Sequence, residues 1–196
     1  MAKPTRIAIA ADSPDTILAG TMLAEQGGNV VDIAVGTALA AAHTEILMCS
    51  LGGSAFINLH LPGREAEIIE GGDAMPASAV GLQAKEASWR EAHIPYGDGI
   101  TVNVGHGSIA TPGMLSALET AWQRHGSLPW REILAPAIHF ARHGATVNQT
   151  LANWLELTGE TVFSVQPHSH ECFFSGGKML KVGDEFTLPD YLPTLE

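Results

Sequence analysis

Histidine pairs are the first residues whose type and spacing could bind a metal ion. His139 and His143 lie four positions apart in a segment predicted to be helical, but Phe140 stands where the zinc motif H-E-x-x-H has its glutamate. His168-Ser169-His170-Glu171-Cys172 has suitable ligand types, yet no second cysteine or histidine pair lies at zinc spacing. We therefore expect packed or surface histidines, with no metal site and no cofactor.

Segments that could supply a nucleophile or a phosphate site are also incomplete. Ser54 follows Gly52 and Gly53 but does not lie in G-x-S-x-G, the strand–turn–helix signature of serine hydrolases. Backbone N–H groups of this turn could face an anion, and a tight turn between packed elements explains the glycines equally well. Gly105-His106-Gly107 lacks the rest of a dinucleotide or phosphate loop. The residues by themselves identify no catalytic group.

The composition excludes several classes of function. The formal net charge is −11 and the ten Lys and Arg residues form no patch, so no nucleic-acid partner is expected. The apolar stretch Ile7–Ala11 is strand-sized, too short for a signal peptide or a membrane span. Cys49 and Cys172 are too few and too far apart for a disulfide framework. We therefore expect a cytoplasmic protein that does not bind a membrane.

The low content of charged residues, 16%, is relevant to whether another chain covers part of the protein surface. A free-standing soluble domain usually has about a quarter of its residues charged. Two interpretations stay open: part of the surface is covered by another chain, or the chain is a compact enzyme domain with a large core.

One helix should lie at the centre of the fold. Gly27-Gly28 ends the helix before it, Asn29 can cap the next one, and Asp32 stands at the reciprocal capping position. Residues 33–42 are almost all alanine, glycine and other small side chains, so that other elements can approach closely on every side. We expect this helix to be buried and to end near His43.

The remaining elements mix helices with few strands. The expected strands are a buried strand over 6–10, a hairpin over 55–61 and 65–70, and an extended stretch at 100–104. The expected helices begin at Ser13-Pro14, at 78 or 79 (to 93), at Thr111-Pro112 (to Gly126), at Ser127 (to 143, kinked or broken at Pro136) and at 148 (to 158), before an extended tail from 160. A sheet of about three strands is incomplete by itself, which suggests that another chain completes it.

Five segments, in order along the chain, resemble motifs of the gamma-glutamyltranspeptidase family of N-terminal-nucleophile hydrolases. Residues 27–34 resemble its GGNAVDAA element, 44–56 a divergent EPHxSGIGGGGF segment, and 108–113 its SVGVPG turn. Residues 125–144 closely match LPW-xELLxPAIxxAxxG, and 188–195 resemble QPDLAxTL. Because the match follows the family's order along nearly the whole chain, we identify the chain as a member by resemblance.

The resemblance implies a fold class and a partner. Residues 1–196 would be a single α+β domain, the large-subunit part of a four-layer αββα fold, helix-rich with few strands in this chain. The family's precursor cuts itself, and its nucleophile is the threonine freed at the start of the small subunit, whose α-amine is the base. Oxyanion-hole donors also lie in that later part. No THxSVVD-like segment precedes Glu196, so we expect the nucleophile to come from the small subunit.

The substrate pocket departs from the family's pattern. An FRExAP or GRExAP motif places an arginine against the substrate's α-carboxylate, and Gly72 stands at that arginine's position in Glu70–Pro76. We predict that Gly72 and Asp73 bind substrate; the alternative is an ordinary turn after a strand. Arg64 is near in sequence but belongs to the predicted hairpin turn, so it is not a replacement.

These departures suggest an amidase or acylase, similar to the family's oxamate amidohydrolase-like and cephalosporin acylase-like members. The expected function is amide hydrolysis or acyl transfer through an acyl-enzyme, on a small-molecule amide that is not γ-glutamyl. The expected partner is the small subunit of the same precursor or gene cluster, and a higher oligomer is left open. The alternative is a non-catalytic scaffold or binding module that keeps only the large-subunit fold.

Overall fold

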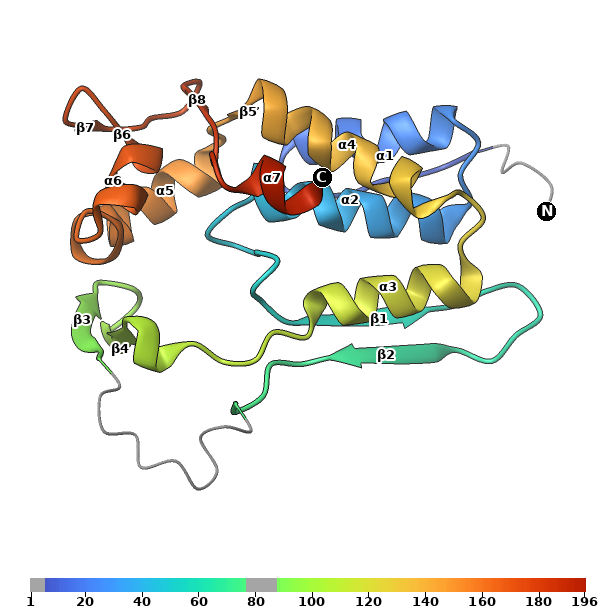
Figure 1. Cartoon of the computed structure of the whole chain (residues 1–196), viewed down its shortest axis with the longest axis horizontal. Coiled ribbons are helices and arrows are strands. Elements are labelled where there is room, and N and C mark those ends of the chain that lie inside the picture. Colours follow the sequence, from blue (N-terminus) through green and yellow to red (C-terminus); the bar gives the residue numbers. More distant parts are fainter. Residues whose placement is uncertain (1–5, 77–87) are drawn as a thin grey trace. The chain divides into compact units, whose positions relative to one another are not determined.

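A computed structural model describes residues 6–76 and 88–196 (Figure 1). The contacts divide the chain into two compact units. The first contains the described residues up to 73 together with 112–146 and 187–196, and the second contains 74–111 and 147–186 without the undescribed stretch. That residues 1–196 form a single domain stays a prediction.

Helices form the larger part of the first unit. α2 (Val30–Thr44) packs between α1 (Pro14–Glu25) and α4 (Trp130–His143), as Figure 1 shows. α3 (Met114–His125) also contacts α2, and α7 (Tyr191–Leu195) contacts α4. The short strand β5 (Ala145–Thr146) follows α4. The core therefore lies around α2.

The predicted central helix is confirmed, including its cap. The Asn29 side chain accepts from the backbone N–H groups of Val31 and Asp32, and the Asp32 carboxylate accepts from the N–H of Asn29 at 2.8 Å. Gly36 shows why small residues are needed: a Cβ there would lie 2.2 Å from Leu23 Cδ1 and 2.9 Å from the carbonyl oxygen of Ile133. A larger residue would push α1 and α4 away from α2.

An antiparallel hairpin completes the first unit and confirms a second prediction. β1 (Ala55–Leu59) pairs with β2 (Glu67–Gly71), with Phe56 opposite Glu70. One face of the hairpin packs against α3, and side chains on the other face are exposed. Because side chains alternate along a strand, residues 67, 69 and 71 face α3, whereas 68 and 70 face outward.

The second unit combines a short hairpin with helices. β3 (Arg90–Ile94) pairs antiparallel with β4 (Ile100–Val104), followed by the 3₁₀ turn η2 (His106–Ser108). Its other elements are α5 (Gln149–Thr158), the π-helical turn η3 (Gly159–Phe163), α6 (Pro167–Phe173), β6 (Phe174–Ser175), β7 (Lys178–Met179) and β8 (Glu185–Phe186). The mixture of helices and short strands agrees with the predicted α+β class.

The buried strand expected over 6–10 is absent. This segment is extended but forms no strand with the described residues, and Ile7 is 39% exposed. Its composition is that of a strand, but a strand needs a neighbour with free N–H and C=O groups. The described part of the chain supplies none at this place.

The helix expected up to residue 93 is also wrong where the structure describes it, because Arg90–Ile94 is a strand. Pairing with residues 100–104 buries Ala92 and Ile94 and exposes the residues between them. This hairpin pairing overrides the helical propensity of the segment. The part of the expected helix from 77 to 87 lies outside the described residues.

Three further expectations need smaller corrections. The helix expected at Thr111-Pro112 begins at Met114, where Gly113 is the N-cap without a side-chain bond. Pro136 does not break α4, which continues to His143. The tail after residue 160 includes helical turns as well as extended segments. Among the described helices, none has the length and apolar composition that a membrane crossing requires.

Candidate functional site

The candidate site lies at the end of β2, where the chain passes from Gly71 through Gly72 to Asp73. Three backbone segments meet here: the N–H groups of Gly113 and Met114 donate to the Gly53 carbonyl at 3.2 and 3.0 Å. A Cβ on Gly71 would lie 2.5 Å from the Gly113 carbonyl oxygen and 2.5 Å from Ala117 Cβ. Glycine at 71 and 113 therefore allows the hairpin to lie directly on the start of α3.

Gly72 has quite different surroundings. A Cβ on Gly72 would make only ordinary contacts, at 3.6 Å from Glu70 Oε1 and 3.7 Å from Phe56 Cζ. Phe56 is 69% exposed, and Asp73 is exposed as well. Gly72 therefore lies beside an aromatic ring and a carboxylate, and Asp73 after it is on the surface. Their role in binding stays a prediction.

Within the described residues, no positive charge pairs with the carboxylates at this end of the hairpin, where the family's motif has its arginine. Neither Glu70 nor Asp73 forms an ion pair or a side-chain hydrogen bond with any residue that the structure describes. Arg64 lies in the turn at the other end, where its backbone N–H donates to Leu61 and its guanidinium is 3.4 Å from His125 Nδ1. The expectation that Arg64 does not serve as the anchor agrees with this placement.

A charged cluster fixes that other end of the hairpin to α3. Glu67 contacts Arg124 and lies 2.7 Å from His125 Nε2. These contacts, the hydrogen bond from His125 first, lower the pKa of the Glu67 carboxyl. The hairpin is thus held to α3 at both ends, by charge at Glu67 and by close backbone packing at Gly71.

The glycine–asparagine motif before α2 has a structural role that its sequence did not reveal. The Asp32 carboxylate is fully buried and also accepts from the Ser127 N–H (2.8 Å), the Ser127 hydroxyl (2.5 Å) and the Leu128 N–H (3.2 Å). Asn29 Nδ2 donates to the His125 carbonyl. A buried carboxylate with this many donors holds the α3–α4 loop against the start of α2.

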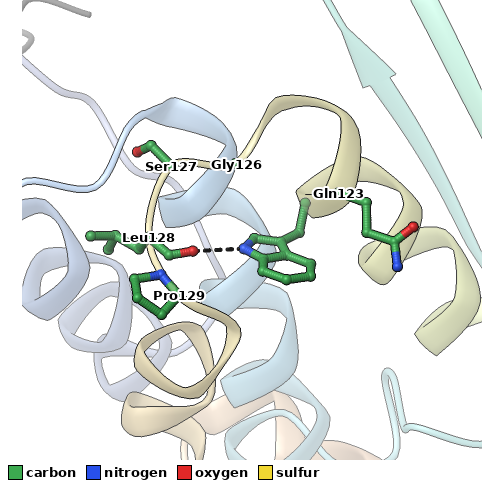
Figure 2. A pocket seen from close by; sticks show the side chains of 6 residues that line it. Gln123, Gly126, Ser127, Leu128 and Pro129 are labelled. Atoms are coloured by element: carbon green, nitrogen blue, oxygen red, sulfur yellow. Dashed lines mark hydrogen bonds between the residues drawn. The ribbon is translucent and has the colours of Figure 1, made fainter.

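A surface hollow of about 480 Å³ lies beside this loop, lined by Trp122, Gln123 and residues 126–129 (Figure 2). Figure 2 shows the Leu128 carbonyl accepting a hydrogen bond, which comes from Trp122 Nε1 at 2.8 Å. None of the lining residues has an ionisable side chain. The hollow therefore has a packing role rather than a chemical one.

The other sequence candidates have structural explanations. His139 and His143 lie together on α4, with ring centroids 4.8 Å apart, and His170 on α6 stacks on Phe174 at 4.4 Å. In the described ranges 6–76 and 88–196, no three His, Cys, Asp or Glu residues could hold a metal ion. Gly105 lies close to the backbone of another segment, because its Cβ would be 2.5 Å from the Ser88 carbonyl oxygen.

Sequence reasoning missed a polar cluster at the end of α2. The Tyr191 hydroxyl donates to the Leu39 carbonyl at 2.7 Å, and its ring lies 5.2 Å from that of His43. Burial lowers the pKa of His43 to about 4, and burial with the nearby Glu45 charge raises the pKa of Cys49 to about 11. His43 is therefore neutral and Cys49 a protonated thiol at neutral pH, which is unfavourable for a nucleophile. The cluster anchors α7 rather than performing chemistry.

Two surface grooves were also not predicted. One, of about 440 Å³, lies between residues 7–11 and the exposed side of α2. The other, of about 500 Å³, lies in the second unit and is lined by Trp89, Ile109 and Val165 among others. For either groove, the only signal in the sequence is the presence of apolar residues next to a short apolar run.

Comparison with known proteins agrees with the motif order. The family described as Gamma-glutamyltranspeptidase matches residues 17–196. Glutathione hydrolase proenzyme 1 of Schizosaccharomyces pombe is 27% identical over 177 residues, covering 90% of this chain and 26% of that protein. This chain thus spans about a quarter of that curated relative.

Solved structures show the same relationship. The gamma-glutamyltranspeptidase from Pseudomonas nitroreducens, complexed with L-DON, is similar with a TM-score of 0.77 at 26% identity, covering 98% of this chain and 54% of that one. The cephalosporin acylase from Bacillus halodurans has a TM-score of 0.72 at 24% identity, covering 100% of this chain and 38% of that one. These likenesses confirm the predicted fold as the large-subunit portion of an N-terminal-nucleophile hydrolase. With the family match extending over nearly its whole length, the chain belongs to the gamma-glutamyltranspeptidase family.

Proposed function

We propose that this chain is the large-subunit part of an enzyme that hydrolyses amides or transfers their acyl group. The observation that carries the proposal is the family match over residues 17–196. It is supported by the curated relative named a glutathione hydrolase and by the structures named gamma-glutamyltranspeptidase and cephalosporin acylase. No metal or organic cofactor is needed for this chemistry.

The proposed reaction passes through an acyl-enzyme on the N-terminal threonine of a small subunit. The threonine hydroxyl attacks the amide carbonyl carbon while its own α-amine takes the hydroxyl proton. The C–N bond then breaks, the amine leaves with that proton, and the acyl group stays on the threonine oxygen as an ester. Water or an amine acceptor attacks the ester and releases the acid or a new amide. Hydrogen-bond donors must stabilise the oxyanion in both steps.

The small subunit is also the proposed partner of the uncovered N-terminal segment. Residues 6–10 are extended, exposed for the most part, and lie along the groove with α2. Val30, at the start of α2, is 52% exposed on this groove. A strand from the partner beside residues 6–10 would pair their backbone groups and cover this apolar side. We also propose a cytoplasmic location, because the two cysteines provide no disulfide framework.

Covalent labelling tests the enzyme class. We expect a small diazo ketone that mimics an amide to label the complete protein once, on the threonine that begins the small subunit. Peptide mapping by mass spectrometry gives the position, and the variant with alanine at that threonine is the control. Labelling within residues 1–196 would contradict the proposal.

The substrate is proposed to be an amide other than a γ-glutamyl amide, because Gly72 supplies no guanidinium for an α-carboxylate. A Cβ at Gly72 would make only ordinary contacts, so we expect Gly72→Arg to fold. We expect kcat/KM for γ-glutamyl p-nitroanilide to rise about tenfold in Gly72→Arg relative to Gly72→Ala, as a charge-assisted pair would give. Rapid γ-glutamyl transfer by the unmodified protein would contradict this part.

A further inference from the structure

We propose that Phe56 is the residue that determines which acyl group this site accepts, and that the preferred acyl groups are uncharged and apolar. This inference rests on the proposed function and on the predicted binding of substrate at Gly72 and Asp73. It adds two features to that site. The first is the Phe56 ring, a platform on which an apolar acyl group would pack, and the second is the Glu70 carboxylate, a barrier that would repel a negatively charged acyl group.

The space around Gly72 indicates the platform. Phe56 Cζ lies 3.7 Å from the position of a Cβ at 72, so any longer side chain there would extend across or beside the ring. Glycine leaves the ring uncovered, and Phe56 is 69% exposed. An exposed aromatic ring gains most by burying an apolar or aromatic group.

The charges around Gly72 indicate the barrier. Glu70 is the cross-strand partner of Phe56, and its Oε1 atom lies 3.6 Å from the Cβ position at 72. No described cation pairs with Glu70 or with Asp73. A carboxylate on the acyl group would meet like charge where the family's motif places an arginine, and like charges at such a distance repel.

Phe56 differs from the other exposed large apolar side chain on the same face of the hairpin. Ile68 is also 69% exposed, but it lies opposite Asn58, two positions further along the hairpin from Phe56 and Glu70. Ile68 is not among the atoms within 4 Å of the Cβ position at 72. It therefore serves as a matched control with equal exposure and no expected contact with the acyl group.

The test uses the complete protein and three p-nitroanilides that share one leaving group: phenylacetyl, glutaryl and γ-glutamyl. We expect kcat/KM for the phenylacetyl compound to exceed that for the glutaryl compound at least tenfold. Phe56→Ala should lower the phenylacetyl value about tenfold, a size typical of losing apolar contact in a pocket, with Phe56→Leu intermediate and Ile68→Ala within about twofold. Glu70→Gln should raise the glutaryl value several-fold and change the phenylacetyl value less than about twofold.

The outcomes separate this inference from the proposed function. If the threonine is labelled and amides are cleaved, but Phe56→Ala changes the phenylacetyl value no more than Ile68→Ala does, only the role of Phe56 is overturned. A glutaryl or γ-glutamyl preference in the unmodified protein overturns the substrate class. Absence of both labelling and cleavage overturns the proposed function and this inference together. Thermal melting curves of each variant show whether a loss comes from unfolding.

Discussion

The two faces of the β1–β2 hairpin differ more than their sequences suggest. On the face toward α3, Glu67 is held by charge, Ile69 is 6% exposed, and Gly71 touches the backbone at Gly113. On the opposite face, Ile68 is 69% exposed, and Gly72 after it has room for a side chain. One strand therefore has a closely packed face and an open face in strict alternation.

This difference shows that residue type alone does not reveal the structural or functional role of a residue. Gly71 and Gly72 are neighbours and chemically identical, yet a Cβ would clash at Gly71 and would make only ordinary contacts at Gly72. Residues 67, 69 and 71 should therefore respond to substitution through stability. Residues 68, 70 and 72 should respond little in stability, and the effects of residues 70 and 72 should appear in substrate preference.

The largest expected effect is at Gly71. In Gly71→Ala the new methyl group would lie 2.5 Å from a carbonyl oxygen and 2.5 Å from Ala117 Cβ, so the hairpin or α3 must move. We expect a loss of about 3 kcal/mol in the free energy of unfolding, at the upper end of overpacking effects. Denaturant unfolding of the complete protein measures it.

Gly72→Ala is the control for that experiment, with an expected change of less than about 0.5 kcal/mol because its methyl group meets only ordinary contacts. Equal losses in the two variants would show that the two faces are not distinct in packing. A loss in Gly72→Ala alone would reverse the comparison.

The next largest effect on the free energy of unfolding is expected at Ile69, in the middle of β2. Ile69→Ala removes buried methylene and methyl groups from the contact with α3 and should cost about 2–3 kcal/mol. Ile68→Ala removes the same atoms from an exposed position and should cost less than about 0.5 kcal/mol. Comparison of the two unfolding midpoints is sufficient, and a difference below about 1 kcal/mol would contradict the inward packing of Ile69.

Local signals in the sequence were sufficient for the elements that depend on neighbouring residues. The Asn29–Asp32 capping box, the caps at Ser13 and Asn148, and the turn between β1 and β2 involve groups within a few positions of each other. The family's motif order, matched over residues 17–196, supplied the rest of the fold.

The predictions from sequence were wrong or incomplete where residues outside a segment determine the structure of that segment. Residues 6–10 have the composition of a strand but no neighbouring strand in the described part of the chain, and Arg90–Ile94 becomes a strand only through pairing with 100–104. The same reason hid the contrast between Gly71 and Gly72, because the atoms that distinguish them belong to Gly113 and Phe56. Asp32 was predicted as a cap, but its bonds to residues 127 and 128 span 95 and 96 positions.

The smallest expected effect is at Glu67, where the attachment to α3 is electrostatic and partly exposed to solvent. The pKa of this carboxyl is lowered in the folded protein from its ordinary value of 4.5, so the folded state binds this proton less readily than the unfolded state does. Its contribution is therefore present above about pH 4.5 and is lost as the pH falls through the folded-state pKa. We expect Glu67→Gln to lower the Tm slightly at pH 7 and the difference from the unmodified protein to shrink as the pH is lowered below about 4.5. Glu70→Gln, on the open face and without an ion pair to any described residue, should show no such pH-dependent difference. A Glu67→Gln difference that does not shrink on acidification would mean that packing of this side chain, rather than its charge, fixes the hairpin to α3.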